Sequence, residues 1–126
     1  ASRVLVIDPS RNASYQLDES YSGSSTYRTS AVAADGRIFA APFMASRVLV
    51  IDPSRNASYQ LDESYSGSGK YRTSAVAADG RIFAAPFMAS RVLVIDPSRN
   101  ASYQLDESYS GSRYHTSAVA ADGRIF

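Results

Sequence analysis

The chain has 126 residues, of which 44% are hydrophobic and 20% charged, and its formal net charge is +1; such a chain can build the core of one small domain and is not disordered. The near-neutral charge gives no electrostatic footprint for nucleic acid, and the absence of cysteine excludes disulfides and thiolate metal sites. No apolar run approaches the roughly 20 residues of a membrane helix, and no charged and then apolar leader opens the chain. We therefore expect a soluble protein without a nucleic-acid or membrane partner, whose compartment the sequence leaves unknown.

Three almost identical repeats make up the chain. The stretch ASRVLVIDPSRNASYQLDESYSGS begins at Ala1, Ala45 and Ala89. The chain therefore divides into repeat 1 (residues 1–44), repeat 2 (45–88) and a shorter repeat 3 (89–126). Duplicated natural genes drift mostly at exposed positions, yet even the turn serines are unchanged here. We interpret the chain as a designed, synthetic sequence, suited to expression in the bacterial cytoplasm; a very recent natural duplication is the alternative.

The sequence of each repeat predicts four strands, of which the first two are described here for repeat 1. The segment Arg3–Asp8 (RVLVID) is β-branched and apolar on both faces, as in a strand that lies between two other layers, and Pro9 ends it. The segment Tyr15–Tyr21 (YQLDESY) alternates in character, which indicates a half-exposed strand at an outer edge. The Asn12 turn lies between them, since asparagine tolerates left-handed backbone.

The last two predicted strands form a hairpin. The segment Thr29–Ala34 (TSAVAA) has small side chains that suit a crowded place, and Asp35-Gly36 is a strong hairpin turn. The segment Arg37–Phe43 (RIFAAPF) follows and leads into the next repeat. No window shows helical periodicity with caps, so the predicted fold class is all-β, with four antiparallel strands in each repeat.

Four strands at this spacing are typical of one blade of a β-propeller. The small-residue strand is then innermost, followed outward by RIFAAPF, RVLVID and YQLDESY. Because the chain starts on RVLVID, the third strand, each blade is cut between its second and third strands. Repeat 3 must then be completed by the N-terminal strands of a neighbouring chain, or of the same chain in a closed ring.

Three blades cannot close a ring, because propellers have about four blades or more. An open arc exposes apolar blade faces and unpaired strand edges, which favours association, and head-to-tail contacts that close give cyclic symmetry. We therefore expect an obligate homo-oligomer, with six blades in a dimer or nine in a trimer.

The repeat ASRVLVIDPSRNASYQLDESYSGSGKYRTSAVAADGRIFAAPFM, complete in repeat 2, resembles that of the Cake-type proteins, which are computationally designed symmetric β-propellers. The resemblance covers the whole chain and is broken only at Ser25-Thr26 and at Arg113-Tyr114-His115. It implies self-assembling rings of eight or nine blades, and three blades per chain select nine, a homotrimer. It also implies a scaffold without a natural substrate, not an enzyme, and no cofactor.

Sequence variation is confined to the stretch between the outermost and innermost strands. We take these edited positions and their neighbours as candidate site residues: Ser25, Thr26, Arg28, Gly69, Lys70, Arg72, Arg113, Tyr114 and His115. The arginines, Lys70 and His115 would make one propeller face cationic, suited to multivalent anions such as metal-oxo clusters. The alternative is that the edits only break the symmetry of the repeats.

Two sharper hypotheses involve His115, the only histidine. Three copies around a threefold axis could ligate zinc or another divalent transition metal, although a nine-bladed channel is wide for ligand distances of about 2.0–2.1 Å. A designed hydrolase could instead pair His115 with Ser112 or Thr116 and with Asp106 or Glu107, but no G-x-S-x-G motif supports it.

Overall fold

The computed structural model describes residues 2–23 and 26–126, and the described residues form strands, turns and loops, with no helix that could cross a membrane. The first sheet has two strands, β1 (Ser2–Asp8) and β2 (Ala13–Tyr21). The second has four strands, β3 (Tyr27–Val32), β4 (Ile38–Pro42), β5 (Leu49–Asp52) and β6 (Ala57–Gln60). The third also has four, β7 (Ala75–Val76), β8 (Ile82–Ala84), β9 (Leu93–Asp96) and β10 (Ala101–Gln104).

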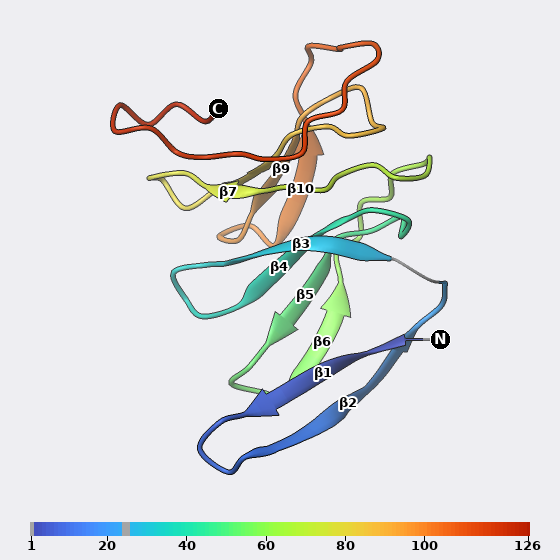
Figure 1. The fold of residues 1–126 in the computed structure, drawn as a ribbon, viewed down its shortest axis with the longest axis vertical. Helices are drawn as coiled ribbons and strands as arrows, with labels where there is room; N and C mark the ends of the chain where they lie inside the picture. Colours follow the sequence, from blue (N-terminus) through green and yellow to red (C-terminus); the bar gives the residue numbers. More distant parts are fainter. Residues whose placement is uncertain (1, 24–25) are drawn as a thin grey trace.

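The sheets follow one another along the molecule in chain order, with the C-terminal segment beyond the third sheet (Figure 1). Within the two complete sheets the strand orders are β3-β4-β5-β6 and β7-β8-β9-β10, and all neighbouring pairs are antiparallel. This confirms the predicted order from the small-residue strand to the tyrosine-rich strand. The predicted cut within a blade also holds for the sheets, since β3 and β4 come from repeat 1 whereas β5 and β6 come from repeat 2.

Incomplete sheets lie at both ends of this series. β1 and β2 correspond to the two outer strands of a sheet, and in the described chain no inner strands pair with β1. At the other end, residues 118–126 form only the inner hairpin, with a bridge between Val119 and Ile125. The chain thus contains two complete sheets flanked by two complementary halves.

The turns are specified locally, as the sequence predicts. Asn12 and its two equivalents have φ angles of 53–54°, the left-handed region that asparagine tolerates. The Asp8 carboxylate accepts hydrogen bonds from Ser10 N (3.0 Å) and Ser10 Oγ (2.6 Å), which closes the turn after β1. Gly36 in the inner hairpin has a φ of 90°, and its N–H donates to Ala33 O (3.0 Å).

The outer strand is shorter in the complete sheets than predicted. β2 extends to Tyr21, as expected, whereas β6 and β10 end at Gln60 and Gln104. In the second sheet the Arg47 guanidinium donates hydrogen bonds to the carbonyls of Leu61 and Gln60 where β6 ends, and Leu61 N still donates to Val48 O (3.0 Å). The inner strand β7 is also reduced to two residues, so the strand limits expected from the repeats hold only in part.

The core lies between the two complete sheets. Phe39, Val50 and Leu61 from one sheet pack in a single buried cluster with Ile82 and Leu93 from the other. Small residues such as Ala41 and Ala84 lie in the same cluster and allow the sheets to approach closely. Each sheet is therefore stabilised mainly by burying its face against the next one.

The turn carboxylates Asp8, Asp52 and Asp96 predict an acid-sensitive fold. A hydrogen bond from the serine two residues later is the largest cause that lowers their pKa below the ordinary 3.8. Because the folded-state pKa is depressed, the stabilisation is present above about pH 3.8 and is lost as the pH falls through the folded-state values.

The triple variant D8N/D52N/D96N should be less stable than the parent at pH 7, with a smaller loss of stability between pH 5 and 2. Urea unfolding across this pH range measures both effects. The control is D18N/D62N/D106N, at exposed carboxylates outside the turns. Equal pH profiles for the two triple variants would contradict the assignment.

Candidate anion-facing site at the edited loops

The edited positions lie in loops that join the outermost strand of one sheet to the innermost strand of the next. Backbone hydrogen bonds at these positions tie the loops to the neighbouring sheet. Thr26 O accepts a hydrogen bond from Phe43 N (2.9 Å), and Lys70 O accepts the equivalent bond from Phe87 N (2.8 Å). In repeat 3 Tyr114 N donates to Pro86 O (3.2 Å). These backbone bonds do not depend on the side chain at positions 26 and 70, which differs between repeats 1 and 2. Ser25 lies outside the described residues.

Two arginines occupy equivalent places beside phenylalanine rings. The Arg28 guanidinium lies over Phe43, with Cζ 4.5 Å from the ring centroid, and that of Arg72 lies over Phe87 at 4.7 Å. The two rings are 6.3 Å apart. Such cation–π contacts fix the position of a charge that remains partly exposed.

Two further basic groups, those of Arg113 and His115, also contact the Phe87 ring. The Arg113 Cζ atom lies 5.6 Å from the Phe87 centroid, and the His115 ring packs edge-on at 4.8 Å. None of the ion pairs of the described residues involves Arg28, Arg72 or Arg113. We call the basic groups Arg28, Arg72, Arg113 and His115, with Phe43 and Phe87, the cationic row. It can attract anions because no carboxylate neutralises its arginines.

Lys70 differs from the other predicted cations, because its side chain is buried. Its ammonium donates to Gly67 O (2.6 Å), and desolvation lowers the pKa of Lys70 below 10.5. Gly69 beside it has a φ of 61°, and a Cβ atom there would lie 2.8 Å from Met88 Cγ. Lys70 therefore serves the packing of its loop more than the cationic face.

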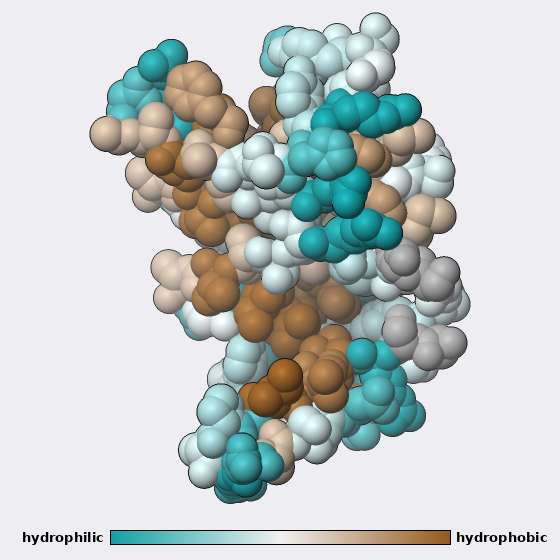
Figure 2. Space-filling model, viewed as in Figure 1, coloured by the Kyte–Doolittle hydropathy of each residue, from teal (hydrophilic) through white to brown (hydrophobic). Residues whose placement is uncertain are grey.

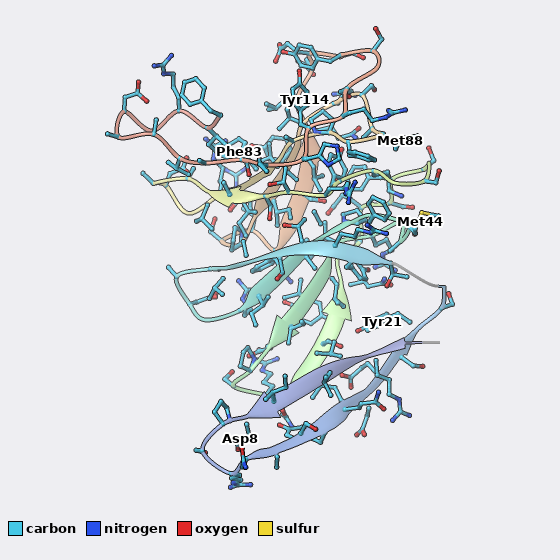
Figure 3. All side chains as sticks on the ribbon, in the orientation of Figure 1. Asp8, Tyr21, Met44, Phe83, Met88 and Tyr114 are labelled. Carbon is cyan, nitrogen blue, oxygen red and sulfur yellow. The ribbon has the colours of Figure 1, made fainter. Side chains whose placement is uncertain are left out.

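Tyr114 in repeat 3 is exposed, unlike its equivalents in repeats 1 and 2. Its equivalents Tyr27 and Tyr71 donate a hydroxyl hydrogen bond to the carbonyls of Arg47 and Arg91. Tyr71 is fully buried, whereas Tyr114 is 52% exposed and lies near the end of the molecule beyond the third sheet (Figure 3). The outer strands that would cover Tyr114 are not supplied by the described chain.

Neither the hydrolase nor a single-chain metal site is assembled. Ser112 Oγ donates to Ala89 O (2.8 Å), and within residues 2–23 and 26–126 no hydrogen bond joins His115 to a hydroxyl or a carboxylate. Over the same residues no three histidine, aspartate or glutamate side chains gather as a possible metal site. In one chain His115 lies beside an aromatic ring that it shares with two arginines, surroundings that repel a divalent cation.

Arg37 makes a contact between sheets that the sequence analysis missed. Its guanidinium donates to Tyr59 Oη (3.0 Å) in its own sheet, and to Asn100 Oδ1 (2.8 Å) and Pro97 O (2.8 Å) in the next. Tyr59 Oη also donates to Asn100 Oδ1 (3.0 Å). The unvarying Asp-Gly-Arg and Arg-Asn-Ala segments are the available signal, although on sequence alone they predict only turns and the start of the strand Arg37–Phe43.

Comparisons with known proteins support the fold. No protein-family model and no curated protein sequence matches the chain. Among solved structures, an inactive H270A virginiamycin B lyase from Staphylococcus aureus, determined with quinupristin, superposes with a TM-score of 0.70 at 11% identity over 90% of this chain. The extracellular domain of BT4673, a putative hybrid two-component system of B. thetaiotaomicron, gives 0.69 at 13% identity over 92%.

Both are β-propeller-like proteins, and the fold of this chain is therefore all-β and propeller-like. The chain spans 38% of the lyase and 15% of the BT4673 chain. At such low identity the likeness concerns the fold alone, and it does not decide whether this chain is an enzyme.

The cationic row predicts unequal effects at two equivalent phenylalanines. Phe87→Leu removes the ring beneath Arg72, Arg113 and His115, whereas Phe43→Leu removes only that beneath Arg28. Both variants lose the same contact between the two rings. Because Phe43 is the more buried ring, each loss is compared with the loss in an arginine-to-glutamine background, R72Q/R113Q for Phe87 and R28Q for Phe43. Phe87→Leu should cost about 1 kcal/mol less in its background than in the parent, measured by urea unfolding. Equal losses in parent and background would show that the cations do not depend on the ring.

Proposed function

We propose that this chain is a computationally designed scaffold of the Cake type, and that three copies assemble by strand complementation into one closed nine-bladed ring. The observation that carries the proposal is the pair of complementary half-sheets: outer strands β1 and β2 at one end, and the inner hairpin of residues 118–126 at the other. Each half is what the other lacks.

The N-terminal half has the exposed apolar face of an unfinished blade. Leu5 is 58% exposed, whereas its equivalent Leu49 is 5% exposed in the complete second sheet. Hydrophobic atoms accordingly gather over the region of β1 in Figure 2. An open groove of about 380 Å³ between the first and second sheets is lined by Val4, Ala40 and Ile51, among others. The inner hairpin of a second copy would fill it.

The C-terminal half has the matching requirement. Phe126 is 68% exposed, whereas its equivalent Phe39 is fully buried. Tyr71 shows the contacts that a completed blade would give Tyr114: its hydroxyl donates to Arg91 O (2.9 Å) and accepts a bond from Gln104 Nε2 (2.8 Å). By equivalence, the outer strands of a second copy would supply Arg3 O and Gln16 to Tyr114.

The blade number follows from the repeat count and the resemblance. Head-to-tail association that closes gives a multiple of three blades, and the Cake-type rings have eight or nine. Nine blades satisfy both conditions, whereas a dimer of six blades satisfies only the first.

The test is native mass spectrometry with one disrupting variant and one control. The parent should give a species near three times 13.6 kDa. Leu5→Asp should shift it to the monomer, because the apolar face of β1 then carries a charge. Ser22→Asp should not, because Ser22 and its equivalents Ser66 and Ser110 are exposed in all three repeats. A species of twice the chain mass would replace nine blades by six, and a monomeric parent would overturn the assembly.

The cationic row favours a second function, the binding of multivalent anions on the scaffold. The supporting observation is that Arg28 and Arg72 are held over rings 6.3 Å apart without carboxylate partners. In a trimer the row would recur three times around the axis. Zinc binding by three copies of His115 is a separate hypothesis, which the neighbouring arginines disfavour.

Tripolyphosphate is a suitable probe, because it carries several charges over a short length. Calorimetric titration at low salt should show binding to the parent, at least tenfold weaker binding to R28Q/R72Q, and weakening with added salt. The control R11Q/R55Q removes the same charge from exposed arginines that pair with Asp8 and Asp52. Equal losses in both double variants would show that only net charge matters.

A further inference from the structure

The bond from a tyrosine hydroxyl to an asparagine of the next sheet recurs along the chain. At the two ends of the series, the donor residues of the third sheet and the acceptor residues of the first sheet have no further sheet to bond to within the described chain. Tyr15 Oη donates to Asn56 Oδ1 (2.8 Å) between the first and second sheets, as Tyr59 does to Asn100 between the second and third. The next step along the series would start from Tyr103. The only remaining equivalent asparagine is Asn12, which lies between β1 and β2 in the first sheet, at the opposite end of the series. The acceptor for Tyr103 would therefore come from a second copy.

We propose that a rim latch joins two copies of this chain: Arg81 and Tyr103 of one copy donate to Asn12 Oδ1 and Pro9 O of the next. The proposal rests on the self-assembly proposed above and names the residues that join and align the copies.

The donor half is already in place. Arg81 donates to Tyr103 Oη (3.0 Å) and to Asp79 (2.8 Å), as Arg37 does to Tyr59 (3.0 Å) and Asp35 (2.9 Å). The engaged Arg37 side chain is 19% exposed, whereas that of Arg81 is 39% exposed. The guanidinium of Arg81 is therefore held by the same hydrogen bonds as that of Arg37, but no next sheet offers it acceptors in the described chain.

The acceptor half is also in place. Asn12 has a φ of 54°, compared with 53° at Asn100, and its N–H donates to Pro9 O at 3.3 Å, as that of Asn100 does to Pro97 O. The turn thus holds the amide and the carbonyl as they are held in the contact that forms. Two preorganised halves join with little loss of side-chain entropy.

Two further polar contacts between successive sheets repeat with the same period, and each also lacks a next partner residue at the C-terminal end of the described chain. Glu63 Oε1 accepts a bond from Ser102 N (3.0 Å), and Thr73 Oγ1 bonds to Ser117 Oγ (2.8 Å). The next instances would join Glu107 to Ser14, and Thr116 to Ser30, of a second copy. The three repeated contacts, which start from Tyr59, Glu63 and Thr73, would therefore all be continued by the same partner, another copy of this chain.

Matched pairs of variants test the latch. Asn12→Gly keeps a residue that accepts a positive φ but removes the amide, and Asn100→Gly makes the same change inside one chain. Tyr103→Phe and Tyr59→Phe form a second pair that leaves the turn intact. Association is measured by sedimentation equilibrium, and chain stability by urea unfolding.

Asn12→Gly should raise the dissociation constant of each junction about tenfold, since it removes the acceptor of one charged and one neutral donor. Tyr103→Phe should raise it a few-fold, and the double variant by less than the product of the two. Asn100→Gly and Tyr59→Phe should change the dissociation constant less than twofold while lowering stability.

The outcomes separate the two proposals. A parent that stays monomeric at high concentration overturns self-assembly and the latch together. A parent that assembles, with Asn12→Gly and Tyr103→Phe both assembling at parental affinity, overturns the latch alone. Equal weakening by the variant and its intrachain control would also overturn it, because the effect would then come from turn or sheet stability.

Discussion

The structure depends on the burial of one sheet face against the next. Phe39 and Val50 from the second sheet and Ile82 and Leu93 from the third form one dry cluster. The apolar face of each sheet contributes to stability only where a neighbouring sheet removes it from water. Each sheet therefore needs a neighbour on both sides, and a series with two ends always leaves two apolar faces exposed. The exposure of Leu5 and Phe126 is the direct consequence.

Polar contacts act within this arrangement by fixing the register of the sheets. The burial of apolar surface is not directional, whereas the bonds of Arg37 and Tyr59 to Asn100 form at one relative position only. Between the first and second sheets the same position is held by Tyr15 and Asn56. The tyrosine–asparagine bond thus recurs at both steps, at 2.8 Å and 3.0 Å, as a constant relation between successive sheets would require. A constant rotation is the condition for closure into a ring instead of an open filament.

The sequence predicted the features that depend on local chemistry. Proline placed the end of β1, asparagine with positive φ placed the turns, and the small residues of TSAVAA placed the inner strand. The strand order and the cut within each sheet followed from the period of the repeat. The position of the cationic pair Arg28 and Phe43 was predicted only as a charged face, since the spacing of letters does not reveal a guanidinium over a ring.

What the sequence could not predict depends on neighbours distant in the chain. Where β6 ends, the Arg47 guanidinium donates to the carbonyls of Gln60 and Leu61, a contact that the sequence pattern does not reveal. The same four letters, YRTS, form part of a six-residue strand in repeat 1 and lie before a two-residue strand in repeat 2. Identical segments therefore adopt different strand lengths, which propensity alone cannot distinguish.

The edited loops show how a repeated fold can carry local variation. Thr26 O accepts a bond from Phe43 N directly after β4, and Lys70 O accepts the equivalent bond from Phe87 N after β8, although the two side chains differ in size and charge. A backbone contact is indifferent to the side chain, so these positions can change while the sheets stay in register. The core and the rim contacts have no such freedom, because there the side chains themselves make the bonds. The repeats are accordingly identical in those places, and their variation is confined to the edited loops.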